Sequence, residues 1–82
     1  MESAVTQIMQ KLMKRLAQKG RFAYASSHET YGIIAEECAE FLDEVRANDV
    51  GNQQKELIDI AVGAIWGLAS LKTLQENKIK NL

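Results

Sequence analysis

The sequence predicts an all-α domain of three main helices, which completes a four-helix-bundle-type core by pairing with a second copy of itself. Apolar residues recur at helical spacing in three segments, and proline is absent from the chain. The breaks between the segments fall at glycine or at short polar stretches. With 82 residues, the chain is expected to form a single domain over residues 1–82, because it is too short for two cores.

The first helix is expected from about Ala4 to Gln18. Its apolar face consists of residues three or four apart, with two methionines beside them: Val5, Ile8, Leu12, Leu16, Met9 and Met13. The basic residues lie on or near the other side and predict a solvated face: Lys11, Lys14, Arg15 and Lys19. Gly20 is a natural stop after the basic last turn.

Ser26 followed by Glu29 predicts a capping box that opens the second helix. This helix is expected to run to about Ala47, where Asn48-Asp49-Val50-Gly51 breaks it. The predicted core stripe is Ile34, Cys38, Phe41 and Val45, and the flank beside it carries Ile33, Glu37, Glu40 and Glu44. As the only cysteine, Cys38 can form no internal disulfide or metal-thiolate cluster, so it is interpreted as a small core residue.

The third helix is expected from near Asn52 to about Asn77. From Leu57 to Leu71 its only charged residue is Asp59, and a helix that is apolar all round is usually buried on every side. Two amphipathic helices cannot cover it, so the pattern predicts a homodimer or a dimer of dimers. Gly63 shares a face with Glu56, Asp59 and Trp66, where it leaves room for a ligand or allows tight helix packing.

Composition narrows the class of protein. The net charge is −1 and the basic residues are scattered, which argues against nucleic-acid binding through a basic patch. The N-terminus lacks the basic and apolar regions of a signal peptide, and the apolar run 57–71 is too short to span a bilayer. We therefore expect a soluble cytoplasmic protein that does not bind membranes.

Two pairs of acids are the candidate metal-binding residues of the sequence. Glu37 with Glu40, and Glu56 with Asp59, are each three residues apart, so each pair points in one direction and all four converge if the helices pack together. An oxygen-only ligand set suits magnesium or manganese. A lone carboxylate in an apolar helix is costly unless it is paired or metal-bound, and the alternative is a salt bridge from Asp59 to a lysine or arginine on a neighbouring helix.

The pattern E-E-x-x-E followed by E-x-x-D resembles the signature of the all-alpha nucleoside triphosphate pyrophosphatases, the MazG-like proteins. It reads here as Glu36-Glu37-Cys38-Ala39-Glu40, a spacer of fifteen residues, and Glu56-Leu57-Ile58-Asp59. The apolar continuation Ile60–Trp66 is similar to the third helix of that family, and the resemblance covers about residues 28–71.

The resemblance implies magnesium-dependent hydrolysis of a nucleoside triphosphate to a monophosphate and pyrophosphate, in a protein that removes unwanted or damaged nucleotides. By motif position it implies metal ligands at Glu37, Glu40, Glu56 and Asp59. Glu36, Glu37 and Glu40 are the implied catalytic acids, with Glu36 either an outer ligand or a residue that orients the attacking water.

Family members often carry a fourth helix with an Asn/Lys/Arg cluster that contacts phosphates, and Asn77-Lys78-Ile79-Lys80 resembles that segment only loosely. The candidate phosphate-binding cations are Arg21, Lys55, Lys78 and Lys80, each of which also reads as a solvated surface charge. The candidates for contact with the base are Phe22, Tyr24, His28 and Trp66, of which Phe22 and Trp66 also read as core residues and His28 as an ordinary surface residue.

Three rival functions compete with this one. Phosphoribosyl-ATP pyrophosphatase belongs to the same superfamily and uses related acid motifs. A non-catalytic helical dimer, such as an adaptor, would satisfy its acids with salt bridges. A carboxylate di-iron bundle is disfavoured, because His28 is the only histidine and does not stand three residues after a glutamate.

Overall fold

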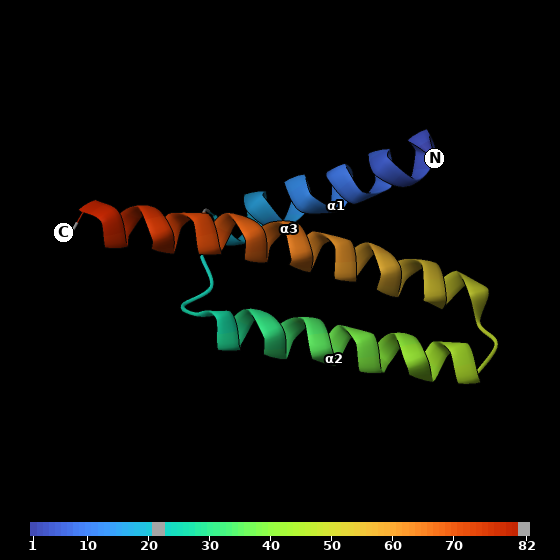
Figure 1. Cartoon of the computed structure of the whole chain (residues 1–82). Helices are drawn as coiled ribbons and strands as arrows, with labels where there is room; N and C mark the ends of the chain where they lie inside the picture. Colours follow the sequence, from blue (N-terminus) through green and yellow to red (C-terminus); the bar gives the residue numbers. More distant parts are fainter. Residues whose placement is uncertain (21–22, 81–82) are drawn as a thin grey trace.

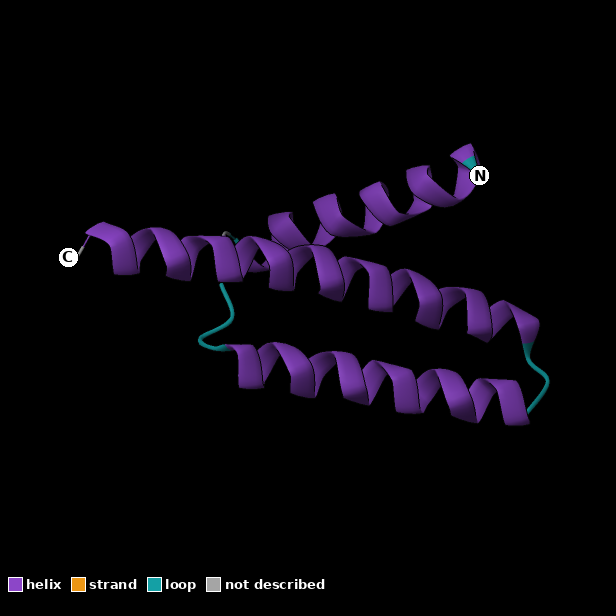
Figure 2. Ribbon diagram, in the orientation of Figure 1, coloured by secondary structure: helices purple, strands orange, loops and turns teal. Residues whose placement is uncertain are grey.

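The computed structural model describes residues 1–20 and 23–80. Within them the chain forms three helices and no strand: α1 (Glu2–Lys19), α2 (Ser27–Arg46) and α3 (Val50–Lys80) (Figure 2). The prediction of an all-α fold with three main helices is confirmed. Two of the candidate binding residues, Arg21 and Phe22, lie outside the described residues, as does the side chain of Lys80.

The long helix α3 organises the chain. Helix α2 runs antiparallel beside it, and α1 packs on another side of α3 and diverges from it toward the N-terminus (Figure 1). The molecule is elongated, with extents of 51 × 24 × 23 Å, because the 31 residues of α3 set its length. Helix α3 therefore contacts both of the other helices and is the place where their side chains can meet.

The first two helix boundaries follow the predicted signals. Gly20 ends α1 with φ 69°, and its backbone N–H donates to the Leu16 carbonyl at 2.8 Å. Ser26 caps α2, because its hydroxyl accepts from the Glu29 backbone N–H at 3.2 Å. The Glu29 carboxylate in return accepts from the backbone N–H of Ala25 at 3.3 Å, one residue earlier than in the usual capping box.

The second break is shorter than predicted. Asn48 takes a left-handed conformation with φ 57°, and the next N–H, that of Asp49, donates to the Glu44 carbonyl, so α2 ends in a Schellman motif. The Asp49 carboxylate then accepts from the Asn52 backbone N–H at 3.0 Å and caps α3. Val50 and Gly51, predicted to lie in the break, are consequently the first residues of α3.

The core of the single chain is small. Among the described residues, the buried apolar side chains are Tyr24, Val62 and Trp66. The Tyr24 and Trp66 rings stack with centroids 6.4 Å apart. The Tyr24 backbone N–H donates to the Ser70 hydroxyl at 2.9 Å, and that hydroxyl donates to the Trp66 carbonyl. These contacts fix the start of α2 against the middle of α3.

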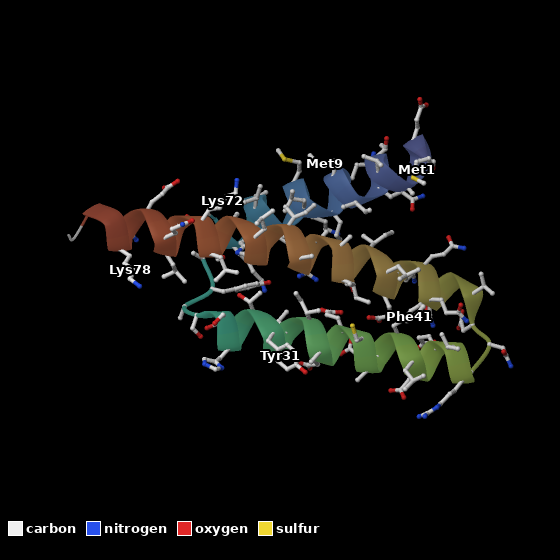
Figure 3. The ribbon with its side chains drawn as sticks, in the orientation of Figure 1. Met1, Met9, Tyr31, Phe41, Lys72 and Lys78 are labelled. Carbon is white, nitrogen blue, oxygen red and sulfur yellow. The ribbon has the colours of Figure 1, made fainter. Side chains whose placement is uncertain are left out.

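Helix α2 presents a different face to α3 from the predicted one. Cys38 and Val45 are exposed, so the interpretation of Cys38 as a core residue is wrong for the single chain. The buried and half-buried positions of α2 include Thr30, Ile33, Ile34, Glu37, Phe41 and Glu44. Figure 3 shows Phe41 between α2 and α3, with Tyr31 on the outer side of α2. The rotation turns the predicted flank of acids toward α3.

Helix α1 also differs from expectation along its length. Val5, predicted to lie on the apolar face, is exposed where α1 diverges from α3, whereas Lys11 and Arg15 are only partly exposed. The prediction of a solvated basic face is wrong for these two residues, because both reach an acid of α3.

Helix α3 extends well beyond the apolar run 57–71. By length and composition, the segment Val50–Lys78 could cross a membrane, a property that core helices of soluble proteins share. The same segment carries Glu56 and Asp59 and packs against both other helices.

Two glycines of α3 predict opposite effects of substitution on stability. A Cβ at Gly67 would lie 2.5 Å from Cγ2 of the buried Thr30, whereas a Cβ at Gly63 would meet nothing within 4 Å. We expect Gly67→Ala to destabilise the fold by about 1–3 kcal/mol through overpacking. Gly63→Ala is expected to stabilise it by up to about 1 kcal/mol through helix propensity. Thermal unfolding of the two variants checks this, and shifts of the same sign would contradict it.

Candidate functional site

Three carboxylates from two helices meet where α2 and α3 face each other. Glu37 of α2 and Glu56 and Asp59 of α3 each offer an oxygen, and these oxygens all lie within 4.8 Å of one another. All three side chains are half-buried. We call these residues the acid triad. The convergence of the two acid pairs was predicted, although only one acid of the first pair belongs to the triad.

The surroundings of the acid triad disfavour the charged forms of two of its members. One oxygen of Glu37 and one of Glu56, Oε2 in each, are buried and have no hydrogen-bond partner. Burial is the largest of several causes that together raise the pKa of Glu56 to about 7; the others are a hydrogen bond with Glu40 and the charges of Glu40, Asp59 and Glu37. Burial also raises the pKa of Glu37, with the charges of Asp59 and Glu40 adding to the effect. Two acids are thus held where their charged forms are disfavoured.

Asp59 differs from the other two acids because it has cationic partners. Arg15 Nη2 lies 3.5 Å from Asp59 Oδ1, and Lys11 Nζ lies 3.8 Å from the same oxygen. Both cations come from α1, so this helix supplies the basic partners of the acid triad. The alternative predicted for Asp59, a salt bridge to a neighbouring helix, is therefore present.

Two polar clefts flank these contacts. One, of about 550 Å³, lies between α1 and α3 and is lined by Lys11, Lys14, Lys55, Glu56 and Asp59, among others. The other, of about 540 Å³, includes residues of α1 and α2, among them Lys11, Lys14, Arg15 and Glu37. Lys11 and Lys14 line both clefts, so cations and carboxylates share the walls of each.

The remaining predicted catalytic acids lie outside the triad. Glu40 is exposed, yet its charge reaches Glu56 and Glu37 and raises the pKa of both. Glu36 is exposed on α2 and does not join the acid triad. The chain therefore brings together Glu37, Glu56 and Asp59, keeps Glu40 beside them, and leaves Glu36 apart.

The predicted substrate-binding residues divide by position. Lys55 lines the cleft beside Glu56 and Asp59, and Tyr24 lines the cleft beside Glu37. Trp66 is buried and lines an apolar cleft of about 320 Å³ with Leu12 and Leu16 of α1.

The other two described candidates are distant from the clefts. His28 is exposed in the first turn of α2 and lines none of these three clefts. Lys78 is exposed near the C-terminal end of α3 (Figure 3), 19 residues after Asp59 and so about 28 Å along the helix. Neither residue is part of the acid triad.

Sequence reasoning missed the contribution of α1. Lys11, Lys14 and Arg15 were assigned to a solvated face, whereas they line the clefts and two of them pair with Asp59. A signal was available, because a buried Asp59 needs a cationic partner or a metal and α1 is the only predicted helix whose basic residues form a cluster.

Comparison with known proteins identifies no relative: no family model, no curated protein and no solved structure matches the chain.

Proposed function

We propose that this chain is a magnesium-dependent nucleoside triphosphate pyrophosphohydrolase of the all-alpha, MazG-like superfamily. It would cleave the bond between the α and β phosphates, giving a nucleoside monophosphate and pyrophosphate, and so remove unwanted nucleotides. One observation carries the proposal: three carboxylates from α2 and α3 converge within 4.8 Å, and two of them keep a buried oxygen without a partner. Carboxylates so placed are stabilised by a bound cation or by a proton, and the proposal assigns a cation to them.

The residues present fit a hard divalent cation. Glu37, Glu56 and Asp59 would hold it, with Glu40 close enough to join from the same face of α2. When bound, magnesium or manganese supplies charge neutralisation of the phosphates and activation of water. The unpartnered Oε2 atoms of Glu37 and Glu56 are the donor atoms available for that role.

The chain's own groups account for the rest of the chemistry. Lys11, Lys14 and Lys55 line the cleft beside Glu56 and Asp59, where they can bind an anionic substrate. A carboxylate of the site that does not bind the cation can accept a proton from the attacking water. The reaction requires no covalent nucleophile, and Cys38 is exposed on α2, outside the acid triad.

The proposed assembly is a homodimer, or a dimer of dimers, with a four-helix core. Among the described residues, thirteen large hydrophobic side chains are exposed while three apolar side chains are buried. Six of the thirteen form two stripes at helical spacing: Tyr31, Leu42 and Val45 on α2, with Cys38 between them, and Leu57, Leu68 and Leu71 on α3. We call these two stripes the hairpin face. A surface of this kind on a small protein marks an interface.

The proposed setting is cytoplasmic, with neither nucleic acid nor membrane as partner. The exclusion of nucleic acid is supported by the scattered basic residues, and Lys11 and Arg15 of the group on α1 pair with Asp59 of the same chain. The exclusion of a membrane is supported by Glu56 and Asp59 in the first turns of α3, because charged groups within a membrane-spanning segment are costly.

A second function is favoured by one specific observation, the pairing of Asp59 with Lys11 and Arg15. If these ion pairs are the whole reason why an aspartate lies in an apolar helix, the chain is a non-catalytic helical dimerisation module. In that case magnesium should change neither its stability nor its chemistry.

The test is release of pyrophosphate from ribo-, deoxyribo- and modified nucleoside triphosphates and from phosphoribosyl-ATP, with and without magnesium. We expect metal-dependent release, reduced roughly a hundredfold or more in Glu40→Gln and Asp59→Asn. Asp43→Asn, an exposed acid on α2 outside the cluster, is the matched control and should retain activity. Release from phosphoribosyl-ATP alone would assign the chain to the related enzyme. Absence of release by a folded, magnesium-supplied protein would favour the dimerisation module.

A further inference from the structure

The basic residues of α1 form a compact group above the acid triad. Lys14 and Arg15 follow Lys11 by three and four residues, so both lie next to Lys11 on the helix surface. Lys11 and Arg15 both reach Asp59 Oδ1, at 3.8 and 3.5 Å, and Lys14 lines both polar clefts with Lys11. These three residues, called here the α1 cations, lie within reach of anything bound at the acid triad.

The charges of this region are balanced in number but unevenly paired. The two clefts and the acid triad, with Glu40 beside it, together hold equal numbers of acids and bases: the acids are Glu29, Glu37, Glu40, Glu56 and Asp59, and the bases are Lys11, Lys14, Arg15, Lys19 and Lys55. Two of the cations share one carboxylate, while Glu37 and Glu56 each keep an oxygen without a partner. A divalent cation bound by the carboxylates would leave the region with a net positive charge, and only then would it attract a polyanion.

The clefts can hold such an anion. Their volumes, about 550 and 540 Å³, lie in the range of ligand sites, and each is lined by both cations and carboxylates. A phosphate chain that bridges a metal ion would therefore meet Lys11 and Lys14 whichever cleft it entered.

We propose that the α1 cations are the polyphosphate-binding residues of this chain, and that Lys11 and Arg15 exchange Asp59 for phosphate oxygens when a divalent cation takes that carboxylate. This inference rests on the proposed function and adds the residues that recognise the substrate. It assigns the phosphates to the first helix of the chain, in place of Lys78 on the distant part of α3. In the chain without ligand, the same two cations stabilise Asp59.

The experiment measures binding by titration calorimetry, with two probes. The first is Mn²⁺ alone, and the second is α,β-methylene-dATP in saturating Mg²⁺, which the proposed reaction cannot cleave. Lys11→Gln and Arg15→Gln are each expected to weaken binding of the nucleotide at least about tenfold, since each removes a charged contact. The same variants should bind Mn²⁺ alone unchanged or up to about fivefold more tightly, because a competing cation has left Asp59.

Two controls separate this role from a structural one. Lys72→Gln removes an exposed lysine of α3 that lies about 20 Å along the helix from Asp59, and should change neither binding constant. Lys11→Arg keeps the charge and should restore nucleotide binding. Helicity by circular dichroism shows that each variant is folded.

The outcomes also separate this inference from the proposed reaction. Equal nucleotide affinity in the wild-type chain and in a Lys11→Gln/Arg15→Gln double variant would overturn the inference, even if pyrophosphate is released. No nucleotide binding by the wild-type chain would overturn it as well. The expected binding pattern without any pyrophosphate release would support the inference and reject the hydrolysis.

Discussion

Replacing Glu56 by glutamine is expected to stabilise the metal-free protein at pH 8 and to abolish its stabilisation by magnesium. Burial and the charges of neighbouring acids raise the pKa of Glu56 from its ordinary value of 4.5 to about 7. The folded chain at pH 8 therefore carries a carboxylate that it holds at a cost. A neutral amide of the same shape removes that cost, and with it a ligand that the proposed cation requires.

The pH dependence has a definite direction. An acid whose pKa is raised in the folded state binds protons more tightly there, so its contribution to stability is present below pH 4.5 and is lost as the pH rises through about 7. The raised pKa of Glu37 acts in the same direction. We expect the Tm of the metal-free wild-type chain to fall between pH 5 and pH 8, and the fall to be smaller in Glu56→Gln. Solvent reaches these carboxylates and reduces the effect to about 1 kcal/mol, or about 4–8 °C in a domain of this size.

Thermal melts with EDTA or with magnesium, at pH 5, 6.5 and 8, measure both effects. Magnesium should raise the Tm of the wild-type chain most at pH 8, where the acids are ionised, and should leave Glu56→Gln unchanged. Glu76→Gln, an exposed acid near the end of α3, is the matched control and should behave as the wild-type chain. A Tm that rises with pH in the metal-free protein would contradict the expectation.

The elements of the fold were predictable because their signals are local. Gly20 and the pair Ser26 and Glu29 act through hydrogen bonds to residues no more than four positions away, and all were found where predicted. The start of α3 was missed because Val50-Gly51 resembles a break, whereas the cap is Asp49, which precedes it. A glycine inside a polar stretch was given more weight than an aspartate that can accept from the next turn.

The candidate site was predictable only in part, because it depends on how the helices are rotated about their axes. Spacing placed Glu37, Glu56 and Asp59 on facing surfaces, and these three do meet. The choice of the α2 face depends on a close approach at Gly67, where the Thr30 methyl group occupies the space of the missing Cβ. That contact joins residues 37 positions apart, and no periodicity within either helix reveals it.

The cations of α1 were missed for a related reason. From sequence alone, a lysine opposite an apolar stripe is interpreted as solvent-exposed. To predict instead that it forms an ion pair, one must know which neighbouring helix carries an unpaired acid. Once Asp59 is fixed in α3, Lys11 and Arg15 are no longer interchangeable with Lys72 or Lys78. The function of a surface charge is decided by its tertiary neighbours, which the pattern of one helix does not contain.

Replacing Leu68 by lysine is expected to convert a dimer into a monomer. Leu68 lies in the middle of the α3 stripe of the hairpin face, and Met13 lies on α1; both side chains are 59% exposed in the single chain. Exposure alone would thus predict the same result for Leu68→Lys and Met13→Lys. The arrangement of the helices distinguishes them, because the Leu68 stripe of α3 is continued on α2, whereas the exposed stripe of Val5, Met9 and Met13 lies on α1 alone.

Helix geometry supports a single interface rather than scattered contacts. At about 100° per residue, the stripes of α2 and α3 fall on the same side of their antiparallel hairpin, and α1 packs on the other side of α3. Two such hairpins placed face to face make four helices with an apolar centre and leave the acid triad and its clefts open. A lysine at position 68 would be buried there without a partner, at a cost of several kcal/mol.

Sedimentation equilibrium at micromolar concentration gives the mass directly. The wild-type chain and Met13→Lys should sediment at twice the chain mass of 9.2 kDa or at a multiple of it, and Leu68→Lys as a monomer with a lower Tm. A wild-type chain that is monomeric and stably folded would reject the interface. In that case the described part of the chain would stay folded with thirteen large hydrophobic side chains exposed and three apolar side chains buried, which is far less burial than a domain of this length needs.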